Sequence, residues 1–101
     1  MALANKTDSF TGTGNGSATK VGKGYFGFSY GTGSSPVGTL LCEISFDDGS
    51  TYQTLKVPGG TSDASMNAAG VLRLFNPMEG AIARTRCSAY TSGTLVGGIH
   101  Q

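Results

Sequence analysis

Hydrophobic positions recur at every second residue in several short stretches of this chain. The clearest stretch is residues 39–46, in which Leu40, Cys42, Ile44 and Phe46 alternate with mostly polar residues. Alternation with a period of two over this length is typical of a half-buried β-strand and not of a helix. We therefore expect a strand here, with these four side chains on its buried face.

A polar turn, Asp-Asp-Gly-Ser at residues 47–50, follows this strand, and alternation resumes over residues 51–57. Gly49 supplies the positive φ that a short hairpin loop needs, so the two stretches predict a β-hairpin. The turn also presents carboxylate oxygens, which are calcium ligands. It lacks the spaced acidic ligands of a dedicated calcium loop, and Asp and Gly are ordinary turn residues, so a turn is favoured over a metal site.

Further short strands are predicted along the rest of the chain. They cover residues 20–30, 71–75, 81–90 and 94–99, with a short edge strand within 61–67. In 81–90 we expect the small side chains at 81, 83, 85, 87 and 89 on the buried face, because the two arginines that alternate with them are hard to bury unpaired.

The strand at 20–30 is rich in aromatic residues and contains two adjacent rings, Tyr25 and Phe26. An alternating strand cannot bury neighbouring side chains on the same face. One of these two rings is therefore expected at an interface or under a loop.

Seven or eight short strands without a convincing helix predict an all-β protein. At 101 residues the chain is long enough for one domain. We expect a single-domain antiparallel β-sandwich over residues 20–101, of jelly-roll or Ig-like type, because sequence alone does not separate these topologies. Residues 1–19 are polar and rich in Gly, Ser and Thr. We expect them to form a flexible N-terminal arm, the alternative being an extended segment that is ordered by a neighbour.

Charge narrows the range of partners. Only 13% of the residues are charged and the net charge is +1, so no long-range field attracts nucleic acid or an acidic membrane surface. No apolar stretch approaches the roughly 18–20 residues of a transmembrane helix, and the first ten residues lack the apolar core of a secretory signal. We expect neither nucleic-acid nor membrane binding, and synthesis in a cytoplasm.

Few residues offer catalytic or cofactor chemistry. The single histidine, His100, is the penultimate residue, where a positioned catalytic partner is rare. Cys42 and Cys87 fall short of a metal site, and we interpret them as buried thiols that stay reduced. The sequence thus predicts neither an enzyme nor a cofactor.

Three arginines suggest a binding face. Arg84 and Arg86 project from the same face of one strand, and Arg73 on a neighbouring strand would extend them into a small positive stripe. A solvated outer face is the simpler interpretation; the alternative is a docking face for an acidic protein surface. With Phe10 in the arm and Tyr90 at the end of the arginine strand, these residues form the predicted protein interface.

Two motifs resemble small virion proteins of tailed phages. The segment Gly38-Thr-Leu-Leu-Cys-Glu-Ile-Ser-Phe-Asp-Asp-Gly-Ser-Thr-Tyr52 looks like their hairpin, and Arg84-Thr-Arg-Cys-Ser-Ala-Tyr-Thr-Ser-Gly-Thr94 looks like a segment near their C terminus. The resemblance covers about residues 38–101 and departs from the pattern at Tyr52, where a tryptophan is expected. The glycine-rich first third of the chain does not share this resemblance.

The resemblance implies a capsid decoration (cement) protein. Such a protein is a homodimer or homotrimer on the virion surface that binds the major capsid protein and stabilises the head. The alternative within the virion is a tail, head–tail adaptor or fibre-associated module. A carbohydrate-binding sandwich is a further alternative, which Tyr52 and Tyr90 would support if their rings lay coplanar on one exposed face.

Overall fold

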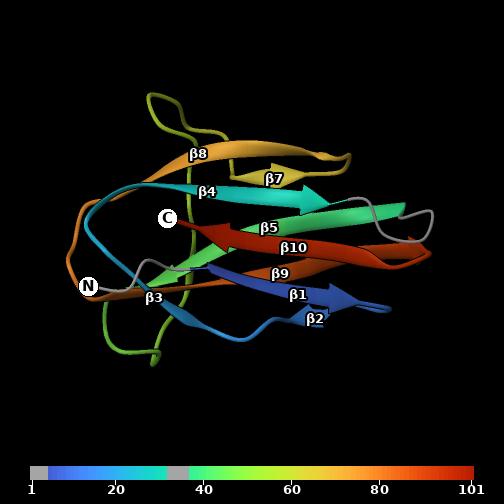
Figure 1. Ribbon diagram of the computed structural model, residues 1–101, viewed down its shortest axis with the longest axis horizontal. Helices are drawn as coiled ribbons and strands as arrows, with labels where there is room; N and C mark the ends of the chain where they lie inside the picture. The colour runs from blue at the N-terminus through green and yellow to red at the C-terminus, as the bar shows by residue number, and fades with distance from the viewer. Residues whose placement is uncertain (1–4, 32–36) are drawn as a thin grey trace.

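The computed structural model describes residues 5–31 and 37–101 and shows ten strands and no helix within them. The strands form two antiparallel sheets that lie one behind the other (Figure 1). The first sheet has the order β1 (Asn5–Phe10), β10 (Leu95–His100), β4 (Gly24–Gly31) and β8 (Gly70–Asn76). This arrangement confirms the predicted all-β class.

The second sheet is built around one long strand pair. Its order is β2 (Gly14–Asn15), β9 (Ala81–Ser92), β5 (Val37–Ser45) and β6 (Gln53–Thr54), with β3 (Thr19–Val21) paired to β9 and β7 (Ser65–Met66) paired to β5. The pairs Glu43–Thr54 and Ile44–Gln53 form the predicted hairpin. Its turn contains two residues with positive φ, Asp48 at 60° and Gly49 at 92°.

The core lies between the two sheets. The first sheet contributes large side chains and the second contributes mostly smaller ones. Fully buried side chains include Phe28, Tyr30, Leu74, Leu95 and Ile99 from the first sheet and Val21, Leu40, Cys42, Ile44, Thr85 and Cys87 from the second.

The alternation predicted for residues 39–46 is wrong at its last residue, Phe46. Leu40, Cys42 and Ile44 are buried as expected, but Phe46 is 41% exposed. The strand ends at Ser45, whose Oγ accepts the Gly49 N–H at 2.9 Å and so starts the turn one residue early. Because the backbone leaves the strand conformation there, Phe46 no longer follows the period of two.

A β-bulge likewise ends the alternation predicted for β9. The odd-numbered residues from 81 to 87 are buried as expected, whereas Ala89 is exposed. Thr39 pairs with Ala89 and Leu40 pairs with Cys87, so Ser88 is an extra residue without a partner on β5. One extra residue exchanges the two faces of a strand, and Tyr90 accordingly packs against the core.

The predicted flexible arm is not an arm over the part that the structure describes. All six residues of β1 pair with β10, and β2 and β3 pair with β9. Strand β1 is held by backbone hydrogen bonds, which do not require apolar side chains. Phe10 at its end is 7% exposed and packs into the core. Residues 5–21 therefore contribute strands to both sheets; residues 1–4 lie outside the described residues.

Candidate protein-binding surface

Strands β4 and β8 together expose a cluster of large side chains on the outer face of the first sheet. Their register places Tyr25 opposite Phe75, Gly27 opposite Arg73, and Ser29 opposite Val71. Even-numbered residues of both strands face the core, so the odd-numbered ones face outward. We call Tyr25, Val71, Arg73 and Phe75 the β4–β8 patch.

The large side chains of this patch are exposed to solvent. Tyr25 is 52% exposed, Val71 72% and Phe75 41%, and Arg73 is exposed beside them. Aromatic residues and arginine are the types enriched in protein interfaces and in their energetic hot spots. Adjacent apolar side chains on one rigid sheet face are typical of a binding surface.

Contacts within the patch hold its side chains in place. The rings of Tyr25 and Phe75 meet edge to face with centroids 5.3 Å apart. The Arg73 guanidinium carbon lies 4.4 Å from the centre of the Tyr25 ring, a cation–π contact. Side chains already ordered in this way lose less conformational entropy when a partner binds.

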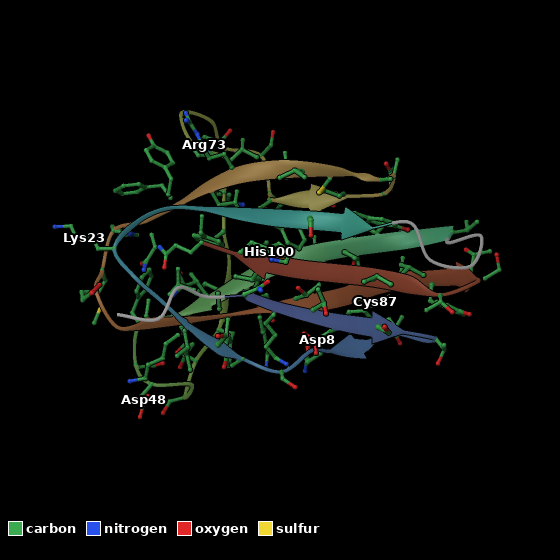
Figure 2. All side chains as sticks on the ribbon, in the orientation of Figure 1. Asp8, Lys23, Asp48, Arg73, Cys87 and His100 are labelled. Atoms are coloured by element: carbon green, nitrogen blue, oxygen red, sulfur yellow. The ribbon has the colours of Figure 1, made fainter. Side chains whose placement is uncertain are left out.

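Arg73 has no carboxylate partner among the described residues. The ion pairs within these residues are formed by four other cationic side chains, those of Lys6, Lys56, Arg84 and Arg86. Figure 2 shows Arg73 beside β8, at the border of the first sheet. Its charge is thus available to a partner.

The predicted stripe that joined Arg73 to Arg84 and Arg86 is wrong. Arg73 lies on β8 in the first sheet, whereas the other two lie on β9 in the second. Arg84 Nε is 2.8 Å from Glu43 Oε1 and Arg86 Nη1 is 3.3 Å from Glu43 Oε2. This face is therefore partly neutralised by a carboxylate on the neighbouring strand β5.

The remaining predicted interface residues lie apart from the patch. Phe10 belongs to the core cluster, and Tyr90 packs against that cluster. The Tyr90 hydroxyl donates to the Gly93 carbonyl at 2.7 Å. Tyr52 is covered by the Arg84 guanidinium, whose carbon is 3.6 Å from the ring centre. Tyr52 and Tyr90 thus do not form an open pair of rings for a sugar.

Val71 and Phe75 were missed as site residues, although the sequence contains a signal for them. In the stretch Val-Leu-Arg-Leu-Phe, an outward Arg73 places Val71 and Phe75 on the same outward face. Tyr25 or its neighbour Phe26 was expected at an interface, and Tyr25 is the exposed one of the two. The pairing of β4 with β8 then assembles the patch.

The groups that sequence analysis weighed for chemistry are engaged in structural contacts. Asp47 Oδ1 accepts hydrogen bonds from Ser45 Oγ at 2.7 Å and from Thr51 N at 2.9 Å, as expected of a turn residue. These bonds, the Ser45 bond most of all, lower the Asp47 pKa below its ordinary value. His100 Nδ1 lies 2.7 Å from Asn5 Oδ1 on the paired strand β1.

Both cysteines are free and buried. Cys42 and Cys87 sit on adjacent strands as diagonal neighbours, since Cys42 pairs with Thr85 and Leu40 pairs with Cys87. Burial raises the pKa of Cys42 to about 12, with the nearby Glu43 charge contributing, and burial also raises that of Cys87. The described residues contain no group of three or more His, Cys, Asp or Glu side chains suited to a metal ion.

Within the described ranges, no helix is long and apolar enough to cross a membrane. Comparison with known proteins finds no matching family, no matching curated protein and no matching solved structure.

Proposed function

We propose that this chain is a non-enzymatic structural protein that binds another protein through the β4–β8 patch. The proposal rests on Tyr25, Phe75 and Arg73, which lie exposed on one sheet face and are held in place by contacts with one another. Such a surface releases water from aromatic rings on docking, while the arginine pairs with an acidic group of the partner. The β-sandwich supplies a rigid support for it.

The resemblance of residues 38–101 to phage virion proteins supplies the setting. In that setting the partner is the major capsid protein, and the chain is a decoration protein of the head, made in the host cytoplasm. Binding the assembled lattice better than separate subunits would stabilise the shell by mass action. Repetition of one modest contact over a symmetric lattice adds avidity.

The copy number of the chain in purified phage particles tests this setting. Quantitative mass spectrometry against the major capsid protein should give a number in the hundreds, comparable with the capsid protein itself. A dozen copies or fewer would place the chain in the tail or at the head–tail junction instead. Absence from the particles would overturn the virion assignment altogether.

The patch is tested by truncating Tyr25 to alanine. Tyr25→Ala should weaken binding to particles that lack the chain by about 10- to 30-fold, the usual effect of removing an aromatic hot spot. Co-sedimentation of the purified protein with such particles measures the change. Phe46→Ala is the matched control, because Phe46 is an exposed aromatic residue that follows β5 of the second sheet, whereas the patch lies on the first sheet. Equal effects of the two variants would remove the patch from consideration.

A further inference from the structure

The four edges of the two sheets differ in how they are protected. Both edges of the second sheet are divided into strands of two or three residues: β2 and β3 on one side, β6 and β7 on the other. Very short edge strands present too few consecutive N–H and C=O groups to pair with another chain. The second sheet is therefore a poor template for strand addition.

The first sheet has two continuous edges, of which only β1 is protected by charge. In β1, Lys6 and Asp8 alternate with outward-facing polar residues, and Lys6 Nζ lies 3.6 Å from Asp8 Oδ1. Asp8 points from β1 toward β2 (Figure 2). Inward-pointing charges of this kind are a common protection against edge-to-edge pairing.

Strand β8 lacks such protection. Its seven residues, Gly-Val-Leu-Arg-Leu-Phe-Asn, contain a single charge and have high β-propensity. Within the described residues β8 pairs only with β4, and no backbone hydrogen bond links it to any other segment. Figure 1 shows β8 at the border of the first sheet. Its outer row of backbone groups is open to a further strand.

We propose that β8 pairs antiparallel with β8 of a second copy of this chain, forming a homodimer with a continuous eight-stranded sheet. A net charge of +1 opposes self-association only weakly. The patch residues are also complementary to themselves, since they combine a cation with exposed rings. A second copy would therefore pair with the open edge strand and also contact the exposed side chains next to it.

The side chains select the register of this pairing. The outward residues of one copy must lie opposite outward residues of the other, which leaves few registers. A two-fold axis at Arg73 would place two like charges directly opposite each other. An axis at Leu74 instead places Arg73 opposite Phe75 of the other copy, twice. One face of each Arg73 guanidinium covers Tyr25, and its other face then meets the partner ring.

The dimer would also enlarge the proposed binding surface. Strand pairing uses the edge of the sheet, whereas the β4–β8 patch lies on its outer face. Two patches then lie side by side across the two-fold axis, and a repeated partner surface can engage both of them.

Sedimentation of the isolated 101-residue chain tests the dimer independently of any phage particle. We expect a dimer at micromolar concentrations. Phe75→Lys places an ammonium group opposite Arg73 of the other copy at both symmetric positions and removes the ring. The dissociation constant of the dimer should therefore rise at least about tenfold. Phe46→Lys is the matched control, because Phe46 and Phe75 are each 41% exposed. Circular dichroism confirms that both variants fold.

A charge exchange tests the register. In the double variant Arg73→Glu with Phe75→Lys, each introduced carboxylate would face the introduced ammonium group of the other copy, so the dimer should return. A monomeric or trimeric native chain would overturn the proposal, as would equal weakening by Phe46→Lys. Failure of the double variant to recover the dimer would exclude the register centred on Leu74.

Discussion

Glu43 shows at the scale of a single residue how this protein accommodates its charges. Its side chain is 7% exposed and lies between Arg84 and Arg86, which are 22% and 47% exposed. Arg84 in turn covers the ring of Tyr52. One carboxylate thus organises two arginines and an aromatic residue across strands β5 and β9.

Replacement of Glu43 should destabilise the protein more than loss of an exposed ion pair. Glu43→Gln keeps the shape but removes the charge that faces two arginines, and we expect the free energy of unfolding to fall by about 1–2 kcal/mol. Asp63→Asn, which breaks the exposed Lys56–Asp63 pair, should cost less than about 0.5 kcal/mol. Urea unfolding of both variants measures these changes, and equal losses of unfolding free energy would contradict the prediction.

Asp47 gives the hairpin turn a dependence on pH. Its pKa is lowered in the folded protein, chiefly by the Ser45 hydroxyl and then by the Thr51 N–H. A carboxylate with a lowered pKa stabilises the fold above its unfolded pKa, near 3.8, and this stabilisation is lost as the pH falls through the folded value.

We therefore expect the native protein to lose more stability between pH 6 and pH 3 than Asp47→Asn does. The asparagine keeps an acceptor oxygen for the Thr51 N–H but does not titrate. Thermal unfolding of both proteins at the two pH values measures the difference. Parallel pH dependence in the two would show that Asp47 does not contribute.

At the scale of the strands, a glycine allows the two sheets to pack closely against each other. A Cβ on Gly97 of β10 would collide with Thr85 Cγ2 and lie 3.2 Å from Leu40 Cδ1, both in the second sheet. By contrast, a Cβ on Gly27 of β4 would find its nearest atom, the His100 carbonyl oxygen, at 3.5 Å on the outer face. The absence of a Cβ is thus necessary for packing at position 97, on the inner face of the sheet, but not at position 27, on its outer face.

Alanine at these two glycines should accordingly have opposite effects. Gly97→Ala forces the sheets apart and should lower the free energy of unfolding by about 1–3 kcal/mol. Gly27→Ala fits its site and restricts the unfolded chain, so it should be neutral or stabilise by up to about 1 kcal/mol. Denaturant unfolding decides between these expectations; a harmless Gly97→Ala would mean that the sheets yield easily.

For the molecule as a whole, the two thiols report on the integrity of the sandwich. Cys42 and Cys87 are both at most 1% exposed, and burial keeps their pKa values above the ordinary range. Thiolates are the reactive form, so a buried thiol with a raised pKa reacts slowly.

A thiol reagent at pH 8 should therefore label the folded protein slowly and modify both cysteines at once after unfolding in urea. Labelling rates with Ellman's reagent, measured with and without urea, test this expectation. Rapid labelling of one thiol in the folded state would show that the sheet opens locally at that position, and Cys42→Ala would identify which thiol reacts.

Local alternation determined much of this protein. The strands around Leu40, Leu74 and Cys87, the hairpin turn at Gly49 and the all-β class all follow from the period of two and from turn chemistry, which act between residues close in sequence. The buried faces predicted within residues 39–46 and 81–90 follow as well, until an irregularity occurs in each stretch.

Contacts between distant segments decided the rest. The polar segment with Asp8 becomes a strand because β10 offers it backbone partners, which side-chain patterns do not reveal. Tyr90 turns inward because Ser88 is an extra residue relative to β5, a property of two strands and not of one. Arg73 is separated from Arg84 because β8 and β9 enter different sheets. The β4–β8 patch exists for the same reason: strand pairing, set by the packing of the whole core, brings Tyr25 beside Phe75.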